Sequence, residues 1–256
     1  MIFGQIIKKY NLLKKFYFLI AFVLLSFTVS AQIGYNYDQF SLGLGVSSIK
    51  IHGDLSKAYS KSAVAVNLNY HVTPFVTFGT EAQFGRLESA NADTSKAYYG
   101  EQSSNKFTTV MFHADVQLGE FINYNDDFSS IPILTKILNG AKNIYIGTGV
   151  GVIFNKMDYI NRTDYKDTNF SYSGLDKSTE LIIPVRIGYE YKIYNAYDEP
   201  NIRLNLGYQA NFSTGDNMDG IKSGHYGDWF SQITFGIKVG IGGVTSYRKP
   251  IHVGPF

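Results

Sequence analysis

Apolar and polar residues alternate with a period of two along most of the chain beyond residue 40. In the first such segment Leu42, Leu44 and Val46 share one face, while glycine and serine share the other. A period of two is the signature of a β-strand with two different faces. The pattern occurs eight times, near residues 40–50, 63–73, 75–86, 107–119, 143–155, 180–193, 201–212 and 229–242.

This alternation fits two opposite structures, because a soluble barrel is apolar inside and a membrane barrel is apolar outside. The predicted strands are about 11–14 residues long, whereas soluble strands average about 5–6 and bilayer-spanning strands need about 9–11. Small residues dominate the polar face, as the narrow lumen of a barrel of eight strands requires. The apolar faces carry no charge. These observations favour the membrane barrel.

The links between the predicted strands alternate in length. The odd-numbered links, 52–61, 87–106, 156–178 and 213–227, are long and polar, while the even links at Thr73-Pro74 and Asn195–Glu199 are short. Outer-membrane barrels have long outer loops and short periplasmic turns. Aromatic residues that would form interfacial girdles lie near strand ends at Phe40, Phe84, Phe154, Tyr189, Tyr191, Phe212 and Trp229. We therefore expect an eight-stranded antiparallel up-and-down transmembrane β-barrel in the cell outer membrane, with both termini in the periplasm.

One even link departs from this pattern, because residues 120–142 form a long connection between the fourth and fifth strands. Within it, apolar residues share one face at helical spacing, and Gly140 follows as a stop signal. These residues are Ile131, Ile133, Leu134, Ile137 and Leu138. We expect a short periplasmic amphipathic helix. It would lie on the membrane surface, dock a partner, or pack against the barrel rim.

The first 31 residues have the features of a cleaved signal peptide. Four lysines precede an apolar or small stretch at 16–29, and Val29-Ser30-Ala31 supplies small residues for cleavage. The stretch is shorter than the ~20 residues of a transmembrane helix. We expect a mature barrel of residues 32–256, with 244–256 as a periplasmic tail. Its formal charge of −2 (19 basic against 21 acidic residues) and lack of a dense basic face argue against nucleic-acid binding.

The polar face that would line the lumen carries several ionisable residues. Glu190, Arg203 and Lys238 are expected at similar heights on neighbouring strands, and Glu81, His113 and Arg186 nearer the middle. Because a buried charge without a partner costs several kcal/mol, we predict a charge-paired network that plugs the lumen. It comprises Glu81, His113, Asp115, Arg186, Glu190, Arg203 and Lys238, and Lys192 shares the same face. The alternative is a switchable gate for a narrow conductance.

Catalytic, cofactor and metal sites are not evident. His113 and Asp115 resemble part of a catalytic triad, but no serine lies in a GxSxG motif. Gly43-Leu44-Gly45 is followed by no helix that could bind a phosphate. Asp216–Gly220 lacks the alternating acids of an EF-hand, so we expect a polar turn rather than a calcium site. The absence of cysteine excludes disulfides, thiolate metal sites and a lipid-anchor cysteine.

Several short segments resemble the eight-stranded outer-membrane barrels widespread in Bacteroidota, which are similar to the transmembrane domain of OmpA. They are Ser30-Ala31-Gln32, Gly53-Asp54-Leu55, Tyr145–Gly151 and Trp229–Gly243. Some barrels of this kind are accessory subunits of secretion or assembly machines, including the type IX secretion barrel, and the resemblance implies such a role only by analogy. One departure is the tail, since related barrels often end on an aromatic residue within the last strand. Whether Phe256 is an assembly signal stays open.

The sequence therefore favours a structural or accessory barrel without enzymatic activity. Expected partners are outer-membrane lipid and lipopolysaccharide, and a protein bound through the outer loops or through residues 120–142. A small porin-like channel for ions or solutes is the alternative, and an enzyme that modifies lipid A is the second alternative.

Overall fold

The computed structural model describes residues 34–55, 57–90, 102–122, 137, 139–163, 169–197, 199–222 and 227–248. Its strands are β1 (Gly34–His52), β2 (Lys57–Tyr59), β3 (Lys61–His71), β4 (Val76–Ala90), β5 (Gln102–Gln117), β6 (Ile144–Asn161), β7 (Lys177–Ile193), β8 (Ile202–Ser213) and β9 (Trp229–Arg248). A short 3-10 helix, η2 (Leu118–Glu120), follows β5. The predicted signal peptide and Phe256 lie outside the described residues.

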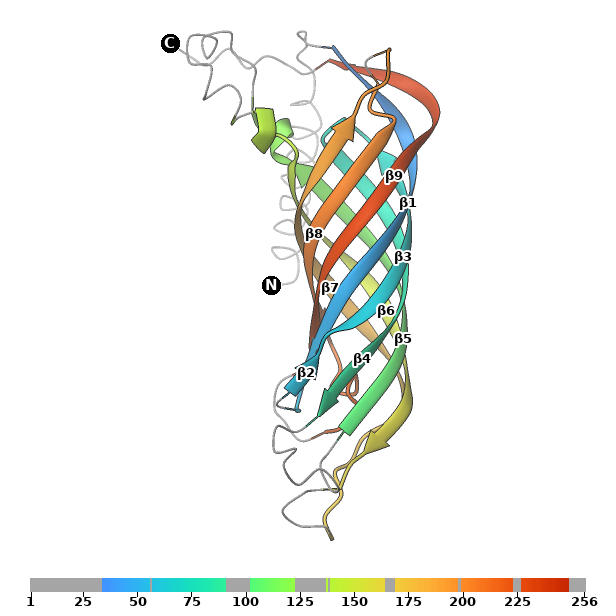
Figure 1. Cartoon of the computed structure of the whole chain (residues 1–256), viewed down its shortest axis with the longest axis vertical. Coiled ribbons are helices and arrows are strands. Elements are labelled where there is room, and N and C mark those ends of the chain that lie inside the picture. Colours follow the sequence, from blue (N-terminus) through green and yellow to red (C-terminus); the bar gives the residue numbers. More distant parts are fainter. Residues whose placement is uncertain are drawn as a thin grey trace, which may run out of the picture. The chain divides into compact units, whose positions relative to one another are not determined.

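Eight long strands form one closed ring, which confirms the predicted barrel. Each strand pairs with its neighbours in the chain, β9 lies beside β1, and the pairing of β4 with β5 completes the circle. The strands wind obliquely around the barrel (Figure 1). The short β2 pairs with the C-terminal end of β4, beyond the residues of β4 that pair with β3. This barrel belongs to the compact unit Asn36–Ser246.

The two faces of the sheet are arranged as the alternation predicts. Leu44, Phe112 and Ile233 are 59%, 62% and 58% exposed on the outside, and the residues next to them along each strand point inward. The buried side chains include many polar and charged ones. An apolar exterior around a polar interior is the arrangement of a transmembrane barrel of the outer-membrane type. Among the described residues, no helix has the length and apolarity needed to cross a bilayer.

The two ends of the barrel differ. We call one the turn end, where β3 and β4 are joined at residues 72–75 and β7 and β8 at residues 194–201. The Thr73 hydroxyl accepts hydrogen bonds from the backbone nitrogens of Phe75 (3.1 Å) and Val76 (3.0 Å), which fixes the first of these turns. We call the other the loop end, where β1–β3, β4–β5, β6–β7 and β8–β9 are joined.

Strands at the loop end are longer than predicted. The β4–β5 ladder continues to Ala90 and Gln102, inside the predicted loop 87–106. Likewise β6 reaches Asn161 and β7 begins at Lys177, inside the predicted loop 156–178. Most outward residues of these extensions are charged or polar, although Tyr159 is 56% exposed. The apolar alternation that marks a lipid-facing strand therefore ends before the strand pairing does.

Two further boundaries are corrected. β9 continues to Arg248, so residues 244–248 of the predicted tail are strand. They were missed because these residues are mostly exposed, so no alternation marks them. Of the predicted helix, residues 131–136 and 138 lie outside the described part of the chain. The backbone is helical at Ile137 and at residues 139–141, one residue beyond the predicted stop at Gly140.

Candidate functional site

The lumen near the turn end holds a buried cluster around Glu190 of β7. The Nζ atom of Lys238 on β9 lies 2.7 Å from Glu190 Oε2, and Nε of Arg203 on β8 lies 3.9 Å from Oε1. Gln117 of β5 donates a 3.0 Å hydrogen bond to Oε1. Lys192 donates to the side chain of Gln117 (2.7 Å) and to the carbonyl oxygen of Pro74 (2.8 Å). We call these five residues the Glu190 cluster.

A histidine extends this cluster toward β1 and β4. The guanidinium of Arg203 donates to Nε2 of His71 at 3.0 Å. Because arginine can only donate, Nε2 is the acceptor and Nδ1 carries the proton. Nδ1 then donates to the Thr77 hydroxyl at 2.8 Å, and the Ser41 hydroxyl lies 3.0 Å from Nε2. His71 is therefore a neutral bridge between strands, a role that the sequence did not indicate.

The middle of the lumen holds a second group, the Arg186 cluster. Arg186 of β7 lies between Glu81 of β4 (Nη2 to Oε2, 3.7 Å) and Asp115 of β5 (Nε to Oδ1, 3.6 Å). His113 Nδ1 lies 3.1 Å from Asp115 Oδ2. The two Arg186 pairs are longer than the 2.7 Å contact between Lys238 and Glu190 and slightly shorter than the 3.9 Å contact between Arg203 and Glu190.

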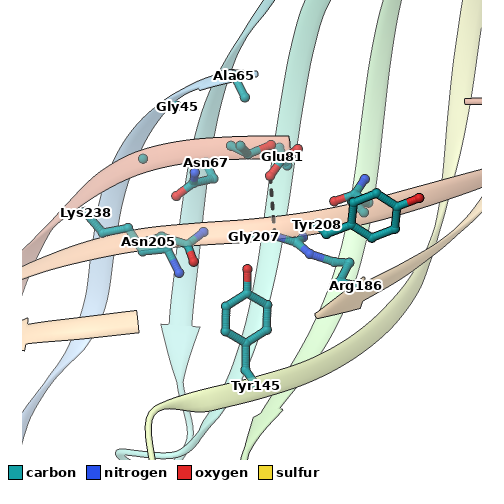
Figure 2. A pocket seen from close by; sticks show the side chains of 13 residues that line it. Gly45, Ala65, Asn67, Glu81, Tyr145, Arg186, Asn205, Gly207, Tyr208 and Lys238 are labelled. Carbon is teal, nitrogen blue, oxygen red and sulfur yellow. Dashed lines mark ion pairs between the residues drawn. The ribbon is translucent and has the colours of Figure 1, made fainter. Parts of the chain in front are cut away.

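A cavity lies beside the Arg186 cluster. Its wall includes Glu81, Arg186, Asn205, Lys238 and Tyr145, and Figure 2 shows the Tyr145 hydroxyl pointing into it. A Cβ atom on Gly207 would overlap that hydroxyl, and one on Gly79 would overlap the His113 ring. Glycines of the inner face thus make room for large polar side chains from other strands, as the narrow lumen requires.

Formal charges in the two clusters balance once Asp38 of β1 is counted with them. Four cations, Arg186, Lys192, Arg203 and Lys238, are buried there, together with the carboxylates of Glu81, Asp115 and Glu190. Asp38 of β1 is 4% exposed and interacts electrostatically with Arg203, which makes a fourth carboxylate. A balanced set of charges can be buried where an isolated charge could not.

The lumen near the loop end is filled by apolar side chains instead. Inward-facing Ile49, Met111, Ile153, Ile182 and Phe230 are 0% exposed and belong to one cluster. We call this cluster the apolar layer. It was not predicted, although a signal exists: Val152-Ile153-Phe154 and Leu181-Ile182-Ile183 are apolar runs in which the alternation is lost. Such runs mean that both faces of a strand are apolar at that height.

The link between β8 and β9 covers the apolar layer. Met218, in this link, is 0% exposed and packs within the apolar layer. Its carbonyl accepts a 2.8 Å hydrogen bond from Asn105 of β5, and the Gly220 carbonyl accepts one of 2.8 Å from Arg162, the residue that follows β6. Gly220 has a φ of 74°, a conformation that other residues adopt only at a cost. We call residues 214–228 the plug loop, of which 223–226 lie outside the described residues.

Two buried carboxylates fix the plug loop. Asp228 Oδ2 accepts hydrogen bonds from the backbone nitrogens of Met218 (2.7 Å) and Asp219 (3.3 Å). Asp219 Oδ2 accepts one from Asp54 (3.0 Å), in the first loop. A Cβ atom on Gly53 would overlap both carboxylates, so they approach each other closely. Burial first, and then the charge of neighbouring carboxylates, raises the pKa of Asp219 and of Asp228.

All seven residues predicted to line the lumen are buried, with exposures of 2–6%. Glu190, Arg203 and Lys238 lie together, and Glu81, His113, Asp115 and Arg186 lie together. Whether this network blocks passage through the barrel stays a prediction. Sequence reasoning did not find the roles of His71 and Gln117, because neutral polar residues on an inner face carry no distinctive pattern, and it overlooked the apolar runs that mark the apolar layer.

The histidine and aspartate that resemble part of a catalytic triad both lie in the lumen. His113 is 5% exposed within the lumen, and among the described residues no hydroxyl forms a hydrogen bond with its ring that could serve as a nucleophile. Asp216–Gly220 forms part of the plug loop, and the described part of the chain contains no group of three or more His, Cys, Asp or Glu residues that could hold a metal ion.

Comparison with known proteins gives similarity of structure alone. The chain matches no protein-family model, and no curated protein matches its sequence. Among solved structures it is similar to Neisserial surface protein A, with 12% identity, a TM-score of 0.45 and coverage of 82% of this chain and 100% of that one. It is also similar to Ail, the attachment invasion locus protein of Yersinia pestis, with 10% identity, a TM-score of 0.41 and coverage of 82% of this chain and 99% of that one. The outer membrane protein OprG from Pseudomonas aeruginosa is similar with 11% identity, a TM-score of 0.36 and coverage of 81% of this chain and 99% of that one.

Proposed function

We propose that this protein is a closed outer-membrane barrel with a structural or accessory role, and that its lumen does not conduct. One observation carries the proposal: buried side chains occupy the described lumen at three heights, in the Glu190 cluster, the Arg186 cluster and the apolar layer, and the plug loop covers the last of these. A barrel of eight strands leaves an interior only wide enough for side chains. Function would then reside on the outer surface and the loops.

Two surfaces are available for a partner. Beyond the apolar residues that face lipid, which we call the apolar belt, the extensions of β4–β7 carry polar outward residues at the loop end. The link 120–142 begins and ends at the turn end, where Glu120 contacts Thr73 and Lys142 contacts Gly119. We propose that one of them contacts a protein partner, in keeping with the resemblance to Bacteroidota barrels that act as accessory subunits. Affinity purification from detergent-solubilised outer membranes, followed by mass spectrometry, tests this. A barrel that is purified alone from such membranes contradicts it.

Conductance across planar lipid bilayers tests closure. The wild-type barrel is expected to give no current steps. The variant Arg186→Ala/Glu190→Ala/Lys238→Ala removes large side chains from both the Arg186 cluster and the Glu190 cluster, and it is expected to conduct. Lys177→Ala, on the outer surface, is the control and is expected to give no current. Regular steps from the wild-type protein would overturn the proposal.

A small ion channel is the second candidate, and the cavity beside Arg186 is the observation that favours it. In a channel, Arg186→Glu would reverse the ion preference of an existing current, whereas a closed barrel has no current to alter. We further propose that the protein has no catalytic activity. Altered lipid A in a deletion strain, restored by the wild-type gene, would contradict this.

A further inference from the structure

Four basic residues form one row on the outside of the barrel at the loop end. Arg86 of β4 lies directly opposite Lys106 of β5, Lys106 lies opposite Lys156 of β6, and Lys156 lies opposite Lys177 of β7. All four side chains are exposed. Adjacent strands are about 4.8 Å apart, so the cations follow one another around four neighbouring strands, whose loop ends lie in the lower part of Figure 1. We call them the basic row.

Each member of the basic row is the first charged residue beyond the apolar belt of its strand. The next outward residues toward the bilayer are Phe84, Thr108, Phe154 and Thr179, and after them come Ala82, Val110, Val152 and Leu181. Phe154 and Leu181 are 47% and 52% exposed, as expected of side chains that face lipid. The basic row therefore lies at the boundary between hydrocarbon and headgroups. Because the strands are tilted by about 35–45°, it crosses that boundary obliquely.

Like charges directly opposite one another on a sheet destabilise it, so an aligned row of cations needs anions. The described residues supply one. At Asp158 the β5–β6 register shifts, since Ser104 pairs with Tyr159 and Asn105 with Met157. The bulge leaves Asp158 without a cross-strand partner, and its carboxylate lies 2.6 Å from Lys106 and 3.5 Å from Arg86.

The other carboxylates nearby are already paired. Glu88 forms an ion pair with Lys61 at 2.6 Å, and Asp176 forms one with Arg162 at 2.7 Å. Among the residues that the structure describes, no carboxylate forms an ion pair with Lys156 or Lys177. The basic row with Asp158 thus keeps a formal charge of +3.

The remaining boundary at the loop end is built differently. On β1, β8 and β9, Trp229 stacks on His52 with ring centroids 3.9 Å apart, and Phe212 stacks on Trp229 at 5.7 Å. Aromatic rings of this kind anchor a barrel without regard to headgroup charge. Exposed lysines also occur singly elsewhere at the loop end, at Lys50, Lys57 and Lys222, but among the described strands only β4–β7 align their cations directly opposite one another.

We propose that the basic row is a binding site for the phosphate groups of an anionic lipid in the leaflet at the loop end. Lysine and arginine are the usual phosphate ligands, lysine as a point charge and arginine as a planar fork of donors. Phosphates at headgroup height supply the anions that the row needs, while the acyl chains of the same lipid cover the apolar residues below Lys156 and Lys177. The site does not depend on whether the lumen is closed.

Spin-labelled lipids test the site on the full barrel, reconstituted in phosphatidylcholine vesicles. The measured quantity is the relative association of labelled phosphatidic acid and labelled phosphatidylcholine with the protein. The wild type is expected to prefer phosphatidic acid several-fold, and Arg86→Gln/Lys156→Gln/Lys177→Gln is expected to remove most of that preference. This variant keeps the Lys106–Asp158 pair, and its three changes are on exposed side chains, so the barrel is expected to fold.

The matched control removes three exposed lysines elsewhere at the loop end, Lys50→Gln/Lys57→Gln/Lys222→Gln, and is expected to keep the wild-type preference. Asp158→Asn removes the one counter-charge and is expected to strengthen the preference. An equal loss in the control and in the row variant would show general attraction by net charge and overturn the proposal. So would a wild-type barrel without preference, which would leave the basic row to an acidic protein.

Discussion

The two halves of the lumen solve the same packing problem with different chemistry. At the turn end, Glu190 is surrounded by Lys238, Arg203 and Gln117 in direct polar contact. At the loop end, Ile182 and Phe230 pack among other apolar side chains under the plug loop. The outward neighbours are apolar in both places, with Tyr191 beside Glu190, and Leu181 and Ile183 beside Ile182. The contents of the lumen are therefore independent of the lipid-facing surface, and only the first half depends on partners of opposite charge.

Replacement of Glu190, the carboxylate at the centre of the Glu190 cluster, should have the largest effect on the free energy of unfolding. Glu190→Gln leaves Lys238, Arg203 and Lys192 buried without their counter-charge. Breaking a buried pair in this way costs about 3–5 kcal/mol, and we expect that loss in the free energy of unfolding, measured by urea titration in detergent micelles. Glu190→Gln/Lys238→Met should recover part of it, because one orphaned cation is removed as well. A loss below about 1 kcal/mol, as for a surface pair, would contradict the account.

Truncation in the apolar layer should cost less. Ile182→Ala is expected to lower the free energy of unfolding by about 2–3 kcal/mol, at the lower end of values for buried isoleucine because the plug loop can move into the space. The same titration measures it. Ile183→Ala, on the neighbouring lipid-facing side chain, is the control and should cost less because lipid fills the gap. Equal effects at both positions would contradict the assignment of the two faces.

A local change in the plug loop should be smaller still. Gly220→Ala forces an alanine into a positive φ, at a cost of about 1–2 kcal/mol that falls on closure of the loop rather than on the barrel. Tryptic cleavage after Lys222 should be faster in this variant, and thermal unfolding of the barrel should change little. Gly243→Ala, where nothing lies within 4 Å of an added Cβ, is the matched control. Unchanged cleavage would show that the loop does not need this conformation.

The smallest expected effect is a pH dependence confined to the loop end. The pKa of Asp219 and that of Asp228 are raised above the ordinary value of 3.8 in the folded loop. The folded loop therefore holds protons that the open loop has released, and closure weakens as the pH rises from 3.8 through the raised values. Fluorescence of Trp229, the single tryptophan, should report this.

Asp228→Asn removes one carboxylate of the pair and should flatten that fluorescence titration. The Glu190 cluster lies at the other end of the lumen, so Lys238→Met should leave the titration unchanged. A pH response that survives in Asp228→Asn would contradict the role assigned to the pair.

The alternation was sufficient to predict eight strands and the direction of each face, because the bilayer imposes one apolar residue in every two. It also indicated which charged residues meet, since Glu190, Arg203 and Lys238 occupy corresponding positions on adjacent strands. It could not give the ends of the strands, because beyond the bilayer Arg86 and Lys106 continue the ladder without an apolar face. The plug loop could not be predicted either, because Met218 is buried against residues of distant strands, and no local sequence pattern encodes that contact.

The central claim is that side chains fill the lumen from both ends, and cysteine reactivity tests it most directly because the natural chain has no cysteine. Ala65 is 2% exposed and borders the central cavity. Ala65→Cys in liposomes should react with a charged, water-soluble thiol reagent far more slowly than Lys57→Cys, at an exposed position beyond the basic row. Similar reaction rates for the two cysteine variants would mean that water and ions reach the middle of the barrel, and the claim would be wrong.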